Sequence, residues 1–206
     1  CGVPHRAASG YIARLIERGY KVAVCDQVED PSVAKGLVRR EVVRVITPGM
    51  VIDEEFLDAR ANNFILALSH TKGMWGLAYL DISTATFRVT ESADIAPILD
   101  EARRLGPREI LLAESGRRDP AAGWSQRLPV LFGDAAFSYV EDAAFDYRRA
   151  YERLTAQLGT LNLEGFGCES FTAGVGAAGA LVYYVGETQK QKTAHLGRIE
   201  SYGLDR

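Results

Sequence analysis

Three short β-strand patterns follow one another between residues 64 and 91, and they constrain the fold more than any other feature of the chain. FILALSH, MWGLAYLDI and TATFRVTE are rich in apolar, β-branched and aromatic residues, and only TKG and a tight corner at Ser83 and Thr84 separate them. Connections this short can join only antiparallel neighbours, so we expect a three-stranded meander.

Helices and strands alternate after the meander. An amphipathic helix should run from a Ser92 cap to Gly106, and EILLA then gives a further strand. We expect residues 115–136 to be mostly loop, and we expect a strand at FSYVE, a helix over 145–158 and a last helix over 172–191. The last helix begins AGVGAAGALVYYV, which is so small-sided that it should lie close against another backbone. This order predicts an α/β fold in which helices flank a mixed sheet.

The first part of the chain reads as a separate α-β-loop-β unit. A short helix is expected over residues 9–18, YKVAVC and LVRREVVRVIT read as strands, and TPG ends the second strand. We therefore expect four parts, namely a partial α/β domain over 1–48, a linker over 49–62, a second domain over 63–192 and a connecting segment over 193–206. Because the chain opens at Cys1 without Met or a signal pattern, we also expect it to be a piece of a longer protein.

Composition narrows the class further. Of 206 residues 25% are charged, and no apolar run is long enough for a membrane helix, so we expect no contact with membranes. Three cysteines without paired spacing argue against a disulfide framework or a structural zinc, and favour the cytoplasm. Eight Lys and Arg against five acids leave residues 1–48 at +3, whereas residues 49–206 carry −6, so the two parts should meet different partners.

A nuclease site is one possible function of the second domain. The order strand-strand-strand-helix-strand is that of a ribonuclease H-like domain, and Asp81 lies where such nucleases keep an acid. A two-metal nuclease needs three or four converging carboxylates, but Glu101 and Glu114 each adjoin arginines that offer ordinary surface pairing. The simpler interpretation is that Asp81 accepts a hydrogen bond from the backbone at Ser83 or Thr84. Asp81 is thus the only catalytic alternative, and neither a histidine triad nor a phosphate-binding glycine loop is suggested.

Residues 25–49, CDQVEDPSVAKGLVRREVVRVITPG, mix acids and bases. The acids lack the alternate spacing of a calcium loop, and EDP is typical of a turn. The basic side chains fit phosphate contacts to double-stranded nucleic acid, and in an extended strand Arg40 and Arg44 would share one face. A solvated polar face explains the same residues, and spacing alone does not separate the two interpretations. The candidate contacts to the DNA backbone are Arg6, Lys35, Arg39 and Arg40.

Several segments resemble one known family. The stretch GVPHRAASGYIARLIERGYKVAVCDQVEDPSVAKGLVRREVVRVITPGMVIDE is similar to the end of the mismatch-recognition domain of the MutS family of bacterial DNA mismatch repair proteins. LDISTATFRVTE, LEGFGCE and AAGALVYYVGETQK are similar to its connector domain. The family's Phe-x-Glu wedge, whose ring stacks on a mispaired base, has no match here, and we expect it upstream of Cys1.

The resemblance implies a ribonuclease H-like connector without nuclease activity. It implies that this part couples the DNA-binding and ATPase ends of a homodimer on mismatched double-stranded DNA, and that it offers a docking surface for the partner protein MutL. ATP and Mg²⁺ would belong to the parent protein, with no cofactor and no enzymatic activity in this part. The candidate docking residues lie on the exposed side of the helix over 145–158, although an ordinary polar helix face is the alternative. They are Arg149, Glu152 and Arg153.

Overall fold

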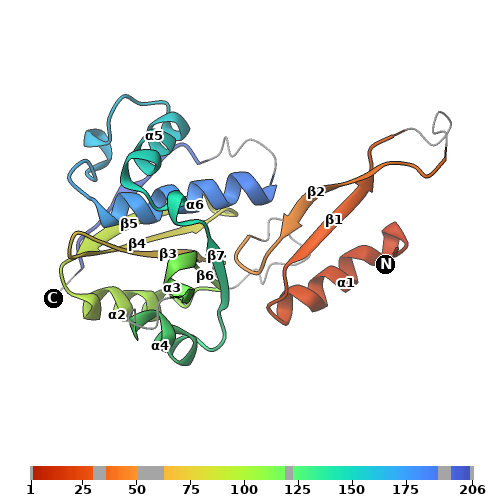
Figure 1. Cartoon of the computed structure of the whole chain (residues 1–206), viewed down its shortest axis with the longest axis horizontal. Coiled ribbons are helices and arrows are strands. Elements are labelled where there is room, and N and C mark those ends of the chain that lie inside the picture. Colours follow the sequence, from red (N-terminus) through yellow and green to blue (C-terminus); the bar gives the residue numbers. More distant parts are fainter. Residues whose placement is uncertain (1, 30–35, 51–62, 119–122, 190–195, 205–206) are drawn as a thin grey trace.

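The computed structural model describes residues 2–29, 36–50, 63–118, 123–189 and 196–204 (Figure 1). The chain forms an elongated N-terminal unit beside a larger α/β domain. In the N-terminal unit, α1 (His5–Glu17) packs on an antiparallel pair, β1 (Val22–Gln27) and β2 (Arg40–Ile46). Ile12, Ile16 and Ile46 form its small core. The expected helix and both strands are confirmed, although the helix begins four residues earlier than expected.

The larger domain is built on a six-stranded mixed sheet with the order β7-β6-β3-β4-β5-β8. The expected meander is confirmed, because β3 pairs antiparallel with β4, and β4 with β5. The strands β6, β7 and β8 pair parallel with β3, β6 and β5, respectively. The strands are β3 (Ile65–Thr71), β4 (Met74–Asp81), β5 (Thr86–Ser92), β6 (Glu109–Ala113), β7 (Ala136–Val140) and β8 (Glu200–Ser201).

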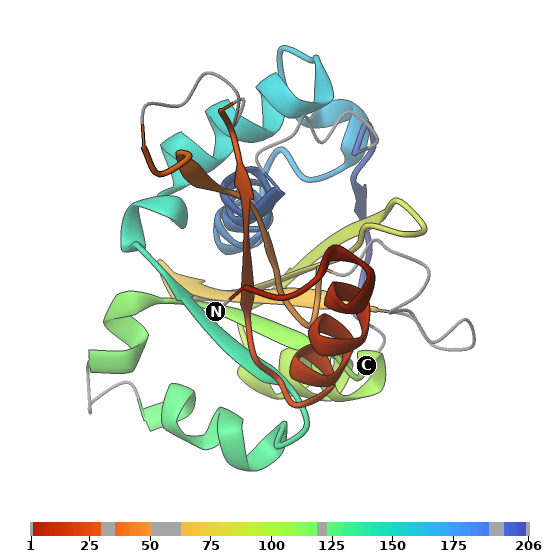
Figure 2. The ribbon, with the colours of Figure 1, turned by 90° about the vertical axis from the view of Figure 1, so that its right-hand side faces the viewer.

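Helices cover both faces of this sheet, which confirms the α/β class (Figure 2). On one face, α2 (Ile95–Leu105) and α4 (Gly123–Leu131) pack against alternate residues such as Leu66 and Leu77. On the other face, α5 (Tyr147–Leu158) and α6 (Ala173–Gln189) pack against the intervening residues, such as Ala67 and Ala78. The shorter elements are α3 (Glu114–Arg118) and the 3₁₀ turns η2 (Asp142–Ala144) and η3 (Glu164–Phe166). No described helix is both long and apolar enough to cross a membrane.

Two local expectations are wrong. Residues 115–136 are not mostly loop, since α3 and α4 lie there. Leu128 and Phe132 are buried against the sheet, and this burial outweighs the poor helix propensity of Pro129. The cap of α2 is Asp94 rather than Ser92: the Asp94 carboxylate accepts from the Ala96 amide at 3.1 Å. The expected ends of α2 and α5 at left-handed glycines are confirmed.

The small side chains of α6 bring it into backbone contact with its neighbours, as expected. A Cβ atom on Gly179 would lie 2.3 Å from the Cβ of Ala150 on α5. A Cβ atom on Gly76, in β4, would lie 2.2 Å from the carbonyl carbon of Ala173, where α6 begins. The helix therefore lies too close to both elements for any side chain to intervene.

The end of the N-terminal unit is buried in the larger domain. We call residues 47–50 the junction segment, and all four are buried. The predicted linker thus starts with two residues, Gly49 and Met50, that are packed rather than solvated. Residues 51–62 lie outside the described ranges, so the domain limits of 48 and 63 stay predictions.

We predict that Gly76→Ala lowers the free energy of unfolding by about 3 kcal/mol, because the new methyl group would overlap the backbone of α6. Urea denaturation followed by circular dichroism measures this. The control is Gly186→Ala within α6, where a Cβ meets nothing within 4 Å. That variant should gain about 0.5 kcal/mol, because alanine loses less backbone freedom than glycine in a helix. Equal stability of the two variants would contradict the close approach of β4 and α6.

Candidate functional site

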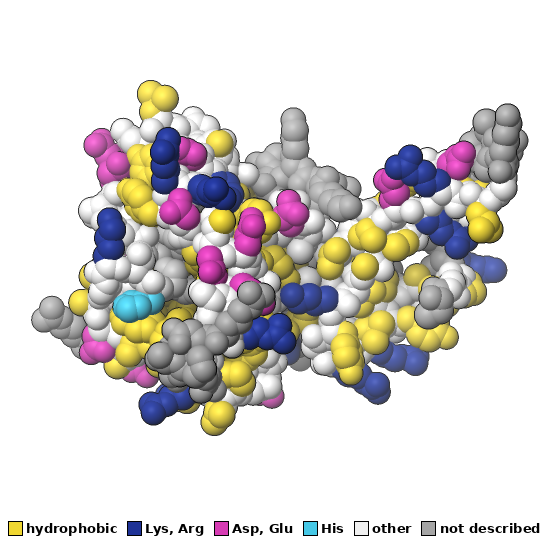
Figure 3. Space-filling model, viewed as in Figure 1, with side chains coloured by type: hydrophobic (Ala, Val, Ile, Leu, Met, Phe, Trp, Pro, Cys, Tyr) yellow, Lys and Arg dark blue, Asp and Glu magenta, His cyan; other side chains and the backbone are white. Residues whose placement is uncertain are grey.

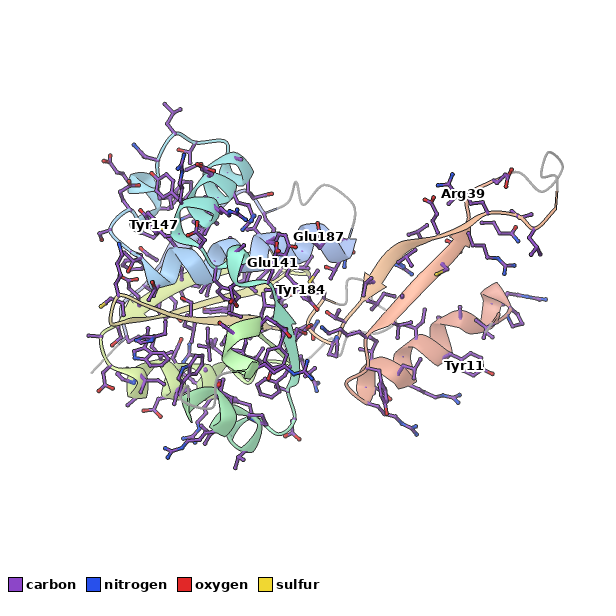
Figure 4. The ribbon with its side chains drawn as sticks, viewed as in Figure 1. Tyr11, Arg39, Glu141, Tyr147, Tyr184 and Glu187 are labelled. Atoms are coloured by element: carbon purple, nitrogen blue, oxygen red, sulfur yellow. The ribbon has the colours of Figure 1, made fainter. Side chains whose placement is uncertain are left out.

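The N-terminal unit carries a basic surface. Arg6, Arg39 and Arg40 are exposed, and Lys and Arg side chains are spread over this unit in Figure 3. The guanidinium group of Arg39, labelled in Figure 4, forms an exposed ion pair with Glu41, and its backbone amide donates to the Glu29 carboxylate at 3.2 Å. Lys35 lies outside the described residues, as do Asp30 and Pro31 of the expected turn. The structure therefore leaves three of the four candidate DNA contacts accessible to a phosphate.

A β-bulge rearranges the arginines of β2. The register shifts by one residue between Arg40 and Arg44, with Val43 as the extra residue. Arg44 lies opposite Val24, which packs toward α1, whereas Arg40 lies opposite Gln27 on the other face. The expectation that Arg40 and Arg44 share a face is therefore wrong. A bulge cannot be read from the spacing of residues in a single strand, because it depends on the pairing with the partner strand.

The exposed face of α5 contains two of the three candidate docking residues. Arg149 and Glu152 are both exposed, and Glu152 accepts from Arg148 at 3.2 Å one helical turn away. Tyr147, at the start of the helix, is 38% exposed, and Figure 4 labels it. Tyr147 and Arg149 are exposed and of residue types that are enriched at protein interfaces, so this face remains a candidate for a protein contact.

Arg153 does not belong to that exposed face. Its guanidinium group donates to the carbonyl oxygens of Ala144 at 3.2 Å and Gly179 at 3.0 Å, and lies 5.0 Å from the centre of the Tyr183 ring. Burial lowers the pKa of Arg153 from its ordinary value. The side chain thus ties α5 to α6. Its position three residues after the buried Ala150 indicates the same thing, because residues three apart share a helix face.

The carboxylate of Asp81 accepts hydrogen bonds from the turn at Ser83, which confirms the simpler interpretation. Asp81 is 1% exposed and accepts from the amide and hydroxyl of Ser83 at 2.9 and 2.6 Å, and from the amide of Asn63 at 3.2 Å. Glu101 is paired with Arg104 at 2.7 Å, and this hydrogen bond lowers the pKa of Glu101. Within the described part of the chain, no group of three or more His, Cys, Asp or Glu side chains could hold a metal ion.

One charged residue at the contact between the units is not predicted from the sequence. Glu109 opens the strand β6, and the pattern of EILLA predicts only a strand. In the structure the carboxylate of Glu109 is fully buried where the two units meet. The available signal was an acid at the start of an otherwise apolar strand, but the partners of that acid are distant in sequence.

Comparison with known proteins identifies both units. Residues 1–55 match the family model described as MutS domain I, and residues 63–199 match that of MutS domain II. Curated relatives named DNA mismatch repair protein MutS include those of Desulfosudis oleivorans and Desulforapulum autotrophicum, which are 51% and 49% identical over the whole chain. The Myxococcus xanthus relative is 43% identical over 97% of the chain. The chain spans 23% of the length of the first two relatives and 22% of the third. Because these matches extend through both units, the chain belongs to the MutS family, with its first unit matching domain I and its larger domain matching domain II.

Proposed function

We propose that this chain is a non-catalytic part of a DNA mismatch recognition protein, in which the larger domain connects the DNA-binding end to the rest of the molecule. The observation that carries the proposal is the match to two adjoining MutS domains along the chain. The relatives are named for DNA mismatch repair, and mismatched double-stranded DNA is therefore the proposed ligand of the parent protein.

The charge distribution supports a DNA-facing role for the N-terminal unit. Residues 1–48 carry a net +3 within a chain of net −3, and Arg6, Arg39 and Arg40 are exposed. Guanidinium groups on an exposed surface contact phosphates without reading sequence. We place this unit against the DNA backbone and leave mismatch selection to other parts of such a protein.

The exposed face of α5 supports the docking role. Arg149 and Glu152 project from a helix that packs closely against α6, and they lie on the larger domain rather than on the basic unit. A partner bound here would leave the DNA-facing arginines free. We propose MutL as this partner, with ATP and Mg²⁺ binding, homodimer formation and cytoplasmic location as properties of the parent protein.

For DNA contact, we expect this chain to bind duplex DNA weakly, with an affinity that falls as salt rises. Arg39→Ala and Arg40→Ala should each reduce the slope of log K against log salt by about 0.9 and weaken all sequences alike. Fluorescence anisotropy over a salt series measures this, with Arg103→Ala on α2 as an exposed control. Binding that does not respond to salt would contradict phosphate contact.

For docking, we expect the double charge reversal Arg149→Glu with Glu152→Arg, made in a full-length protein containing this chain, to reduce MutL recruitment about tenfold or more. DNA binding should stay unchanged, since neither side chain lies on the basic unit. Surface plasmon resonance on immobilised mismatched DNA separates the two effects, with Arg103→Glu as the control. Normal recruitment would exclude this face.

For the absence of catalysis, we expect no cleavage of RNA–DNA hybrid or branched DNA in Mg²⁺ or Mn²⁺, because Asp81 is committed to the Ser83 turn. Gel assays should compare the unsubstituted chain with the Asp81→Asn variant. Metal-dependent cutting that the substitution abolishes would instead establish a ribonuclease H-like nuclease.

A further inference from the structure

The carboxylate of Glu109 receives hydrogen bonds from both units. Its Oε2 accepts from the Thr47 hydroxyl at 2.5 Å and from the Gly49 amide at 3.0 Å, both in the junction segment. Its Oε1 accepts from the Tyr184 hydroxyl at 2.7 Å and from the Ser138 hydroxyl, both in the larger domain. Within the described residues, Oε2 therefore accepts only from the junction segment, and Oε1 accepts only from the larger domain.

A buried carboxylate is stable only while its oxygens have donors, because removal from water is costly for a charge. Glu109 has no exposed surface. Charge-assisted hydrogen bonds of this kind are about twice as strong as neutral ones. If the junction segment left its place, Oε2 would lose both donors while Oε1 kept its own. The burial of Glu109 therefore opposes separation of the two units.

The Tyr184 side chain is the second element of this contact. Burial, with the charge of Glu109 adding to it, raises the pKa of Tyr184, so its hydroxyl remains a proton donor. The ammonium group of Lys21, at the end of the N-terminal unit nearest the larger domain, lies 5.4 Å from the centre of the Tyr184 ring. Tyr184, labelled in Figure 4, thus contacts Glu109 with its hydroxyl and the N-terminal unit with its ring.

The fit around the junction segment leaves no space. A Cβ atom on Gly49 would lie 2.7 Å from the Cβ of Glu109 and 2.9 Å from that of Ile65. Gly49 does not have a positive φ, so it is lack of room, and not backbone conformation, that requires glycine here. Met50 is 1% exposed, and its carbonyl oxygen accepts from the side chain of Gln189 at 3.5 Å. The segment is therefore held between β6 and the end of α6.

We propose that Glu109 is a positioning residue that locks the N-terminal unit onto the larger domain through the junction segment, so that the two units move as one body. A conformational change in either unit is then transmitted without loss across the junction. This consequence for signalling rests on the proposed function, whereas the lock itself does not.

The test measures the distance between the units by pulsed electron spin resonance. One spin label is placed on Cys25, which is exposed, and the other on a cysteine replacing Leu161, which is 96% exposed. Cys1→Ser removes one competing thiol. Cys168 is buried, and burial raises the pKa of its thiol to about 11, so it stays unlabelled at neutral pH. Neither DNA nor MutL is present, so the result is independent of the proposed function.

We expect one narrow distance distribution in the unsubstituted chain. In Gly49→Ala the distribution should be broader, because the new methyl group expels the junction segment. Gly186→Ala is the matched control and should leave the distribution narrow. Thr47→Val, which keeps the shape but removes one donor to Glu109, should accelerate hydrogen exchange of the Gly49 amide by about tenfold. Exchange of core amides in β3 and β4 should not change in Thr47→Val.

A broad distribution of the distance between the spin labels in the unsubstituted chain would overturn the proposal. Unchanged distance and exchange in both Gly49→Ala and Thr47→Val would also overturn it. If circular dichroism shows that Gly49→Ala is unfolded, the exchange rate of Thr47→Val decides alone. If the distances and exchange rates behave as expected but the chain fails to bind DNA, the result contradicts the proposed function and leaves the role of Glu109 intact.

Discussion

The fold depends on the direct contact of α6 with the backbones of β4 and α5. Helices usually pack about 8–10 Å apart because side chains separate their axes. Here Gly76 and Gly179 remove the intervening side chains, and Arg153 on α5 donates to the carbonyl oxygen of Gly179 on α6. Small residues on α6 are therefore a steric requirement, and they allow a nearly uncharged helix to sit in the centre of the domain.

The same helix also reaches the junction with the N-terminal unit. Its first residues lie against β4, whereas Tyr184, Thr188 and Gln189 toward its end contact Glu109 or the junction segment. If α6 moved along its axis, its contacts with β4 and with the junction segment would both change, because the close packing at the glycines leaves no free space. The larger domain is in this sense a rigid support for the unit that carries the basic surface.

Charge is distributed according to this division. The exposed arginines of the N-terminal unit and the exposed face of α5 belong to different units, and the α5 face lies on the side of the sheet covered by α6 (Figures 1 and 2). The two proposed contact surfaces therefore have no residue in common. The buried Glu109 lies where the two units meet, and its carboxylate accepts hydrogen bonds from both units within the chain.

The sequence by itself determined the elements whose causes are local. The meander over residues 64–91 follows from strand patterns joined by short turns, Gly106 and Gly159 end their helices because glycine adopts a left-handed conformation, and Asp81 holds its turn through a neighbour two residues away. Only the tertiary structure decided the features that depend on distant partners. The bulge at Val43 depends on pairing with β1, the inward turn of Arg153 on carbonyl oxygens of η2 and α6, and the role of Glu109 on donors 29 to 75 residues away. Such contacts leave no periodic trace in the chain, because contacts between distant residues are set by proximity in space and not by spacing in sequence.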